Sequence, residues 1–216
     1  MFQDEVYRGT SGVFTNVTQL AEGGFGLIYL ADDQFGNKCI LKKCSISISE
    51  NFQMVQKEVK ILEKFKSAAN IVDIYGTDIS STRNEATIIL EYCGGGNMLS
   101  FLQHRGTNHD YLSKIEICLY FEQVLQAMQL LHTSKPILIN YDLKLENLLI
   151  SDRNNNNNNS NNNNYSSSSN NNINGNIKLC DFGSCVEGYT YLRNSTERSN
   201  VEERLLKETT QAYRSP

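Results

Sequence analysis

The stretch Asp142-Leu143-Lys144-Leu145-Glu146-Asn147 and the triplet Asp181-Phe182-Gly183 decide the fold class of this 216-residue chain. An apolar run at 148–150 follows the first stretch, and a second run at 177–180 precedes the triplet. Both runs predict short strands, which form a hairpin once the Asn/Ser-rich tract between them is set aside. Polar residues that could take part in catalysis or metal binding therefore flank a predicted hairpin on both sides.

These residue types fit phosphoryl transfer. A carboxylate at Asp142 can accept the proton of a hydroxyl, and Lys144 can neutralise the transferred phosphoryl group. Asn147 and Asp181 supply oxygen ligands of the kind that hold Mg²⁺ against the phosphates of ATP. Either motif taken alone is also compatible with an ordinary loop, so the residues that precede them matter.

The first 92 residues predict a five-stranded sheet with one helix. Apolar runs bounded by glycine and turn residues predict the strands, at 13–20, 27–31, 38–43, 71–75 and 86–92. Ser47 and Glu50 fit a capping box at the start of the helix. Apolar residues then recur at helical spacing from Met54 to Phe65.

Two features of this region suit a nucleotide site. The stretch 20–29, Leu-Ala-Glu-Gly-Gly-Phe-Gly-Leu-Ile-Tyr, lets backbone N–H groups approach phosphate oxygens. Lys42 lies on the third predicted strand, and Glu58 occupies the helix face that points to the sheet. Such a lysine can pair with the glutamate and with phosphates. The plainer alternatives are a simple hairpin turn and a solvated surface ion pair.

From Asn97 onward the pattern is helical. Ser113 and Glu116 fit a second capping box. The helix that follows has an apolar stripe made of Ile117, Phe121, Val124, Met128 and Leu131. Its other faces are also largely apolar, and a helix of that kind is normally buried on several sides.

Composition excludes several classes of protein. A net charge of −4 and a pI near 5.5 argue against a nucleic-acid partner. No apolar run reaches the 18 residues of a membrane span, and residues 1–5 lack the features of a secretory signal. Six cysteines without metal-site spacing predict reduced thiols in a cytoplasmic protein. The tract 151–176 is predicted to be disordered, because Asn and Ser bury too little apolar area.

In this order and context, the motifs resemble the signature set of protein kinases: a glycine-rich loop, a strand lysine, a helix glutamate, a catalytic loop and Asp-Phe-Gly. The match runs from about Val13 to Pro216, apart from the Asn-rich tract. The resemblance implies an α+β, two-lobe fold, with a sheet lobe over 1–92 and a helical lobe over 93–216 that carries the insertion at 151–176. It also implies ATP and Mg²⁺ as cofactors and a protein as phosphoryl acceptor.

The resemblance assigns roles residue by residue. Asp142, Lys144 and Thr210 would be catalytic, and Asn147 and Asp181 would hold the metal. Residues 90–93 look like the hinge that binds adenine through its backbone, with a gatekeeper at its start. The implied ATP-binding residues are Leu20, Ala21, Glu22, Gly23, Gly24, Phe25, Gly26, Ile28, Lys42, Glu58, the gatekeeper Leu90, Glu91 and Cys93.

Finer details resemble the Numb-associated kinases, which include the adaptor-associated and cyclin-G-associated kinases. Ala21 stands in place of the first loop glycine, as in that family, and residues 178–184 are close to its Asp-Phe-Gly region. Residues 201–216 look like its activation segment with an extra helix. The resemblance implies Ser/Thr acceptors, with clathrin-adaptor subunits as substrates of several members. Thr210 would contact Asp142 and Lys144.

The chain departs from the family pattern in two motifs. His-Arg-Asp reads Asn140-Tyr141-Asp142, so the arginine that pairs with a phosphorylated activation loop is missing and activation by that route is not expected. Val-Ala-Ile-Lys reads Cys-Ile-Leu-Lys at 39–42, which places Ile40 where a small alanine lies against adenine. A register with Lys43 as the catalytic lysine is the alternative.

A third departure is that the sequence ends at Pro216, where the family continues with most of its helical lobe. We therefore expect an incomplete C-lobe in which Leu119, Leu125 and Leu130 are exposed. Two functions stay open. The full set of catalytic side chains favours an ATP-dependent serine/threonine protein kinase. The altered motifs and the early end favour an inactive kinase-like protein, either a pseudokinase or an ATP-binding module.

Overall fold

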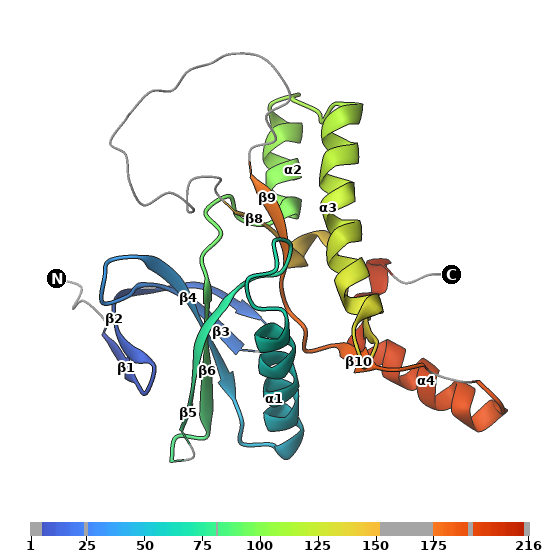
Figure 1. The fold of residues 1–216 in the computed structure, drawn as a ribbon, viewed down its shortest axis with the longest axis horizontal. Coiled ribbons are helices and arrows are strands. Elements are labelled where there is room, and N and C mark those ends of the chain that lie inside the picture. The colour runs from blue at the N-terminus through green and yellow to red at the C-terminus, as the bar shows by residue number, and fades with distance from the viewer. Residues whose placement is uncertain (1–5, 24–25, 81, 152–174, 190–191, 214–216) are drawn as a thin grey trace. The chain divides into compact units, whose positions relative to one another are not determined.

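The computed structural model describes residues 6–23, 26–80, 82–151, 175–189 and 192–213 (Figure 1). The chain divides into two compact units. The first comprises the residues up to Tyr92 together with Asp181–Gly183, and the second comprises Cys93–Cys180 and the residues from Ser184 onward. The predicted Asn/Ser-rich insertion lies almost wholly outside the described residues, as do Gly24, Phe25 and Pro216.

The first unit is built on an antiparallel six-stranded sheet with the order β1-β2-β3-β4-β6-β5. Its strands are β1 (Tyr7–Gly9), β2 (Gly12–Gly23), β3 (Gly26–Asp32), β4 (Lys38–Ser45), β5 (Ile74–Ser80) and β6 (Glu85–Glu91). The prediction of five strands was wrong by one, because β1 has three residues and is too short to show a periodic pattern. Strand β5 begins at Ile74, whereas the strand predicted there spans 71–75. Ile71 and Val72 are buried ahead of it.

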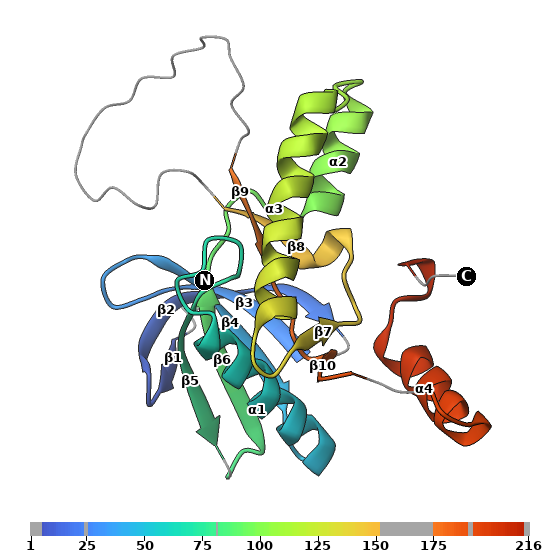
Figure 2. The same ribbon diagram turned by 45° about the vertical axis from the view of Figure 1, so that its right-hand side comes forward.

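One helix, α1 (Ser49–Lys64), packs against this sheet, as Figures 1 and 2 both show. It buries Val55, Ile61 and Leu62, which recur at helical spacing as predicted. The predicted capping box is wrong, because the N-cap residue is Ile48 and no side chain caps the helix. Ser47 instead shares a 2.8 Å hydrogen bond with the hydroxyl of Ser45.

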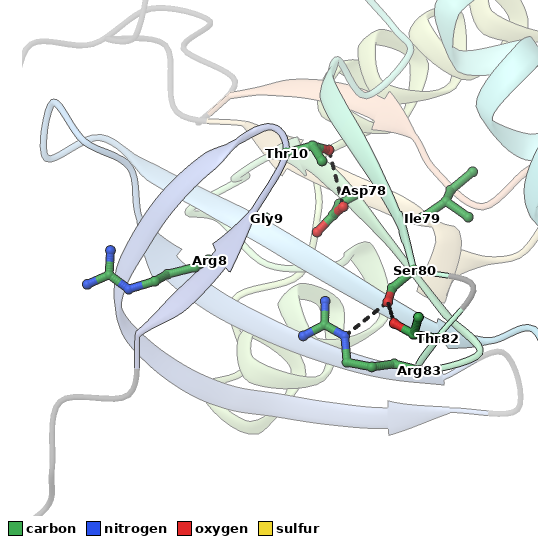
Figure 3. A pocket seen from close by; sticks show the side chains of 8 residues that line it. All are labelled: Arg8, Gly9, Thr10, Asp78, Ile79, Ser80, Thr82 and Arg83. Atoms are coloured by element: carbon green, nitrogen blue, oxygen red, sulfur yellow. Dashed lines mark hydrogen bonds between the residues drawn. The ribbon is translucent and has the colours of Figure 1, made fainter.

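The short strand β1 is held by a carboxylate on β5. The Tyr7 hydroxyl donates a 2.6 Å hydrogen bond to Asp78, and the Thr10 hydroxyl donates another at 3.1 Å. Burial, and then the bond to Asp78, raise the pKa of Tyr7, so the phenol remains a donor. A hollow of about 490 Å³ lies beside this contact, between Arg8 and Arg83 (Figure 3). No predicted site residue is among the described residues that line it.

The second unit is mainly helical. Its described residues form the helices α2 (Met98–Thr107), α3 (Lys114–Thr133), α4 (Ser195–Glu208) and the 3₁₀ turns η1 (Leu145–Asn147) and η3 (Gln211–Tyr213). Helices α2 and α3 lie side by side in both views (Figures 1 and 2), where Phe101 meets Tyr120 edge to face and Arg105 bonds Glu116 at 2.7 Å. The short strand β7 (Leu138–Asn140) pairs with β10 (Cys185–Glu187).

The predicted hairpin around the Asn-rich tract is confirmed. Strand β8 (Leu148–Ser151) pairs antiparallel with β9 (Asn176–Leu179), and the last rung joins Ser151 to Asn176. Gly175 closes this end with φ 142°, and a Cβ there would collide with the Ser151 carbonyl. The Ile150 N–H bonds the Gly96 carbonyl at 2.8 Å, and the Ile177 N–H bonds Gln123 Oε1 at 2.8 Å, so both strands are anchored to the unit.

Helix α3 begins with the predicted capping box between Ser113 and Glu116. Its buried residues are Tyr120, Ala127 and Leu131, so Leu131 alone of the predicted apolar stripe is fully buried. Phe121, a member of that stripe, is 60% exposed. Leu125 and Leu130 are exposed as expected. Leu119 is half-buried, contrary to expectation.

None of the helices in the described part of the chain is both long and apolar enough to cross a membrane. None of the six cysteines, all of which lie in the described residues, forms a disulfide bond. Burial raises the pKa of Cys39 and of Cys44 to about 11, whereas Cys118 is exposed on α3. A thiol reacts as its thiolate, so buried cysteines with raised pKa values are slow nucleophiles.

We therefore expect Cys118 to react first with a water-soluble thiol reagent in the native protein. Cys39 and Cys44 should react only after guanidinium unfolds the chain. The measurement is the time course of thiol titration at neutral pH, followed by peptide mapping of the labelled residue. A Cys118→Ser variant should lose the fast phase, and a fast phase that survives this substitution would show that the assignment is wrong.

Candidate functional site

The first unit places Lys42 in a buried cluster of charges. Its ammonium group donates hydrogen bonds to both carboxylate oxygens of Glu58, at 2.7 and 2.9 Å, and lies 3.4 Å from Asp181 Oδ1. The side chains of Lys42 and Glu58 are only 8% and 6% exposed. Lys43, the alternative in the sequence, instead lies over the rings of Tyr7 and Tyr29. The structure therefore brings Lys42, and not Lys43, to Glu58.

Local structure explains this cluster. Lys42 is on β4 opposite Ile28 on one side and Ile88 on the other, so its backbone is fixed in the middle of the sheet. Asp181 has a left-handed backbone with φ 63°, an unusual conformation for a residue other than glycine. Burial by itself lowers the pKa of Lys42, but the adjacent carboxylates of Glu58 and Asp181 raise it more. The result is a fixed cation, which suits contact with phosphate oxygens.

The glycine-rich stretch lies at the β2–β3 turn of the same unit. Gly23 ends β2 and pairs with Gly26, which begins β3. Gly26 has φ 135°, and a Cβ there would collide with the carbonyl of Lys43, so glycine alone fits. The predicted loop residues Leu20, Ala21 and Glu22 are exposed on β2, and Ile28 is half-buried on β3.

The predicted hinge begins in the first unit and continues in the second. Leu90 is buried on β6, where it pairs with Ile40 of β4. Ile40 is half-buried. The N–H of Glu91, the last residue of β6, bonds the Asp73 carbonyl at 2.9 Å. Cys93 is buried and is the first residue of the second unit.

The second unit gathers the other predicted side chains around Asp142. Oδ1 of this aspartate accepts hydrogen bonds from the Thr210 hydroxyl at 2.6 Å and from the Thr210 N–H at 3.1 Å. Oδ2 lies 2.7 Å from the Lys144 ammonium group and 3.3 Å from Asn147 Nδ2. Lys144 also donates to the Thr210 hydroxyl at 2.9 Å. The predicted contact of Thr210 with both residues is therefore present.

Backbone contacts fix this group. Asn147 Nδ2 donates to the Asp142 carbonyl at 2.9 Å, and the Asp142 N–H donates to Asn140 Oδ1 at 2.8 Å. Burial raises the pKa of Asp142, but Lys144 and Thr210 lower it by more, so the net shift is downward. Asp142 is therefore a carboxylate at neutral pH that can accept a hydrogen bond from a hydroxyl.

Comparison with known sequences bears on this arrangement. A sequence model of the protein kinase domain matches residues 14–216. The chain belongs to the protein kinase family. Membership confirms the α+β, kinase-like fold that the motifs predict.

Curated kinases resemble the chain over most of its length. Two probable serine/threonine-protein kinases of Dictyostelium discoideum are each 31% identical to it, over 203 and 216 residues. Actin-regulating kinase 1 of Saccharomyces cerevisiae is 30% identical over 211 residues. These alignments cover 93%, 98% and 93% of this chain, but 16%, 24% and 30% of the relatives. The kinase chain thus spans less than a third of the length of each.

Kinases ordinarily use ATP and Mg²⁺, and the donor set suits that metal. The Asn147 side-chain nitrogen donates hydrogen bonds to Asp142. The other polar atom of that side chain is an oxygen, which is the kind of ligand that Mg²⁺ takes. Asp181 supplies a carboxylate whose side chain is 23% exposed. The described residues contain no group of three acidic, His or Cys side chains that could hold a metal. A kinase needs none, since Mg²⁺ is usually held by one or two protein oxygens together with substrate phosphates and water.

Two contacts of this chain could not be predicted from its sequence. Arg204 of α4 lies over the Tyr141 ring, and Tyr213 of η3 donates to Glu146 at 3.2 Å. Each contact joins residues more than 60 positions apart, which no local pattern reveals. The one sequence feature that could have indicated the Arg204 contact is the aromatic residue at position 141, where the family has an arginine.

Proposed function

We propose that the chain is an ATP-dependent serine/threonine protein kinase of the Numb-associated type, with residues 1–92 as its N-lobe and residues 93–216 as its C-lobe. The observation that carries this proposal is the Asp142 carboxylate, which already accepts a hydrogen bond from a threonine hydroxyl at 2.6 Å. A serine or threonine of a protein substrate presents the same chemical group to the same acceptor.

In the proposed reaction the substrate hydroxyl gives its proton to Asp142 while its oxygen bonds the γ-phosphorus of ATP. The bond from that phosphorus to the leaving ADP oxygen breaks in the same displacement. Lys144, 2.7 Å from Asp142, neutralises charge on the transferred phosphoryl group. Thr210 favours Ser/Thr acceptors by its contacts with both residues.

The remaining proposed roles concern nucleotide. Lys42 contacts phosphate oxygens, the backbone of Gly23–Gly26 covers them, and residues 90–93 bind adenine. Asn147 and Asp181 would hold Mg²⁺, which would neutralise negative charge on the phosphates. The fixed Lys42–Glu58 pair supports this proposal, because positioning supplies most of the catalysis in phosphoryl transfer.

We also propose endocytic adaptor subunits as the substrate class and the cytoplasm as the location. The first rests on the resemblance of residues 20–25, 178–184 and 201–216 to the Numb-associated kinases. The second is supported by six cysteines that form no disulfide bond, a pattern typical of proteins in a reducing compartment. An ATP-binding module without turnover is the second candidate, favoured by Ile40 beside Leu90 and by Tyr141 beside the proposed base.

Thermal unfolding of the 216-residue chain tests the nucleotide site. A ligand that binds only the folded protein stabilises it by RT ln(1 + [L]/Kd), or about 2.7 kcal/mol at a hundredfold excess over Kd. We expect the melting temperature to rise when ATP and Mg²⁺ are both present, and to rise less with ATP alone. Asp181→Asn should reduce the additional rise in melting temperature caused by Mg²⁺. Lys43→Met should leave that rise unchanged, because Lys43 lies over the rings of Tyr7 and Tyr29 and not at Glu58.

A phosphate-transfer assay then distinguishes the active kinase from the ATP-binding module. A shift accompanied by phosphate transfer to a serine peptide supports the kinase. A shift without transfer supports the binding module. If ATP and Mg²⁺ leave the melting temperature unchanged at millimolar concentration, both proposals fail.

A further inference from the structure

Helix α4 has a narrow inward face. Asn194 caps its start by accepting a hydrogen bond from the Glu197 N–H at 2.8 Å. Among the residues of α4 whose burial is described, the half-buried ones are Glu197, Val201, Arg204 and Leu205, which recur at helical spacing on one face. Helices of this length are marginal on their own in water, so α4 depends on contacts made by this face.

The Arg204 side chain makes the clearest of these contacts. Its guanidinium carbon lies 5.4 Å from the centroid of the Tyr141 ring, and Nη2 lies 3.3 Å from the Tyr141 hydroxyl as donor. A guanidinium within about 6 Å of an aromatic centroid is attracted by the ring electrons. Tyr141 is half-buried and directly precedes Asp142. The contact therefore ties α4 to the residue next to the proposed base.

A second contact lies on the far side of Thr210. Tyr213 donates a 3.2 Å hydrogen bond to Glu146, which belongs to the same loop as Asp142. Thr210 is thus flanked by two anchors, Arg204 before it and Tyr213 after it. Of the two, the Arg204 contact is half-buried, whereas Tyr213 is 45% exposed, so the first should hold more firmly.

We propose that Tyr141 and Arg204 are positioning residues that form a latch, which holds residues 194–213 so that Thr210 bonds Asp142 without any phosphate on that segment. The aromatic ring at 141 is what makes this possible. An arginine at that position would face Arg204 with a like charge and would need an anion between them. This inference deepens the proposed kinase function, because it states how the acceptor side of that site is ordered.

Amide hydrogen exchange of the full chain, read by mass spectrometry, tests the latch without requiring catalysis. We expect Arg204→Ala and Tyr141→Leu each to speed exchange in α4 by between about threefold and about thirtyfold, the range of a cation–π contact. Tyr141→Phe keeps the ring and should rescue most of the protection. Arg198→Ala is the matched control, since Arg198 is an exposed arginine of the same helix.

The double variant Tyr141→Leu/Arg204→Ala shows whether the two residues act as a pair. Its exchange rate in α4 should equal that of either single variant, because one broken contact cannot be broken again. Exchange in α3 of the second unit, unchanged throughout, shows that the unit containing the latch stays folded. The latch is refuted if the single effects multiply in the double variant, or if Arg198→Ala has the same effect as Arg204→Ala.

Steady-state kinetics test whether the latch affects the proposed reaction. In an active chain, Arg204→Ala should raise the KM for a serine peptide and leave the KM for ATP unchanged. Tyr141→Phe should restore the peptide KM. A parent chain that transfers no phosphate would overturn the proposed function, while the exchange measurements would still decide whether Tyr141 and Arg204 form the latch.

Discussion

Replacing Asp142 with asparagine is expected to lower the rate of phosphate transfer to a serine peptide by a factor of about 10² to 10⁴, the usual contribution of a general base. The substitution keeps the size of the side chain and removes its charge. It also presents an amide N–H₂ group to Lys144 or Thr210, which are both donors to the carboxylate in the native protein. The measurement is incorporation of labelled phosphate into the peptide at saturating ATP.

Two controls make this result specific. Asp110→Asn is the matched substitution, because Asp110 is an exposed aspartate of the same unit whose ion pair with Arg105 is worth little at the surface. The melting shift produced by ATP and Mg²⁺ should survive in Asp142→Asn, which shows that the nucleotide site is intact. An Asp142→Asn variant that transfers phosphate as fast as the parent would remove Asp142 from the role of base.

Replacing Glu58 with alanine is expected to lower the free energy of unfolding by about 3–5 kcal/mol, the cost of leaving one partner of a buried ion pair without the other. Lys42 would keep its ammonium group in a buried position, with Asp181 as the remaining carboxylate 3.4 Å away. The measurement is unfolding by guanidinium, followed by fluorescence or circular dichroism. Glu63→Ala, a substitution at an exposed glutamate of the same helix, should change the free energy of unfolding by about 0.5 kcal/mol at most.

A compensating variant separates charge from packing. Lys42→Met/Glu58→Leu replaces the buried pair by apolar residues of similar volume, a change that is often neutral or stabilising. The double variant should therefore recover most of the stability lost in Glu58→Ala and should not respond to ATP and Mg²⁺. Equal melting of Glu58→Ala and Glu63→Ala would mean that the pair does not stabilise the fold.

Features set by neighbouring residues could be predicted from the sequence. The capping box at Ser113 needs only four consecutive residues, and the structure contains it. The hairpin at 148–151 and 176–179 follows from two apolar runs that are each too short to be anything but strands. The meeting of Lys42 with Glu58 follows from the phase of one strand and one helix.

Features set by competition between possible partners, or by distant residues, could not be predicted. Ser47 and Glu50 satisfy the capping pattern, yet Ser45 takes the Ser47 hydroxyl and the helix begins without a side-chain cap. The buried face of α3 packs against β7 and β9 and meets Phe101 of α2 at Tyr120, and it includes Leu131 alone of the most regular apolar stripe. The same holds for the site, where the link from α4 to Tyr141 spans 63 positions.

The closed end of the β8–β9 hairpin has a practical consequence for engineering. Ser151 and Asn176 face each other across the ladder, and Gly96 and Gln123 hold the two strands from outside. A segment inserted between these two residues would begin and end at the same rung of the ladder. Each doubling of the length of a flexible insert costs only about 0.6 kcal/mol of loop-closure free energy. In this sequence the residues between Ser151 and Asn176 are already rich in Asn and Ser. A fluorescent protein or an affinity tag spliced there would report on the chain without touching a rung of the ladder that leads from Asn147 and back to Asp181.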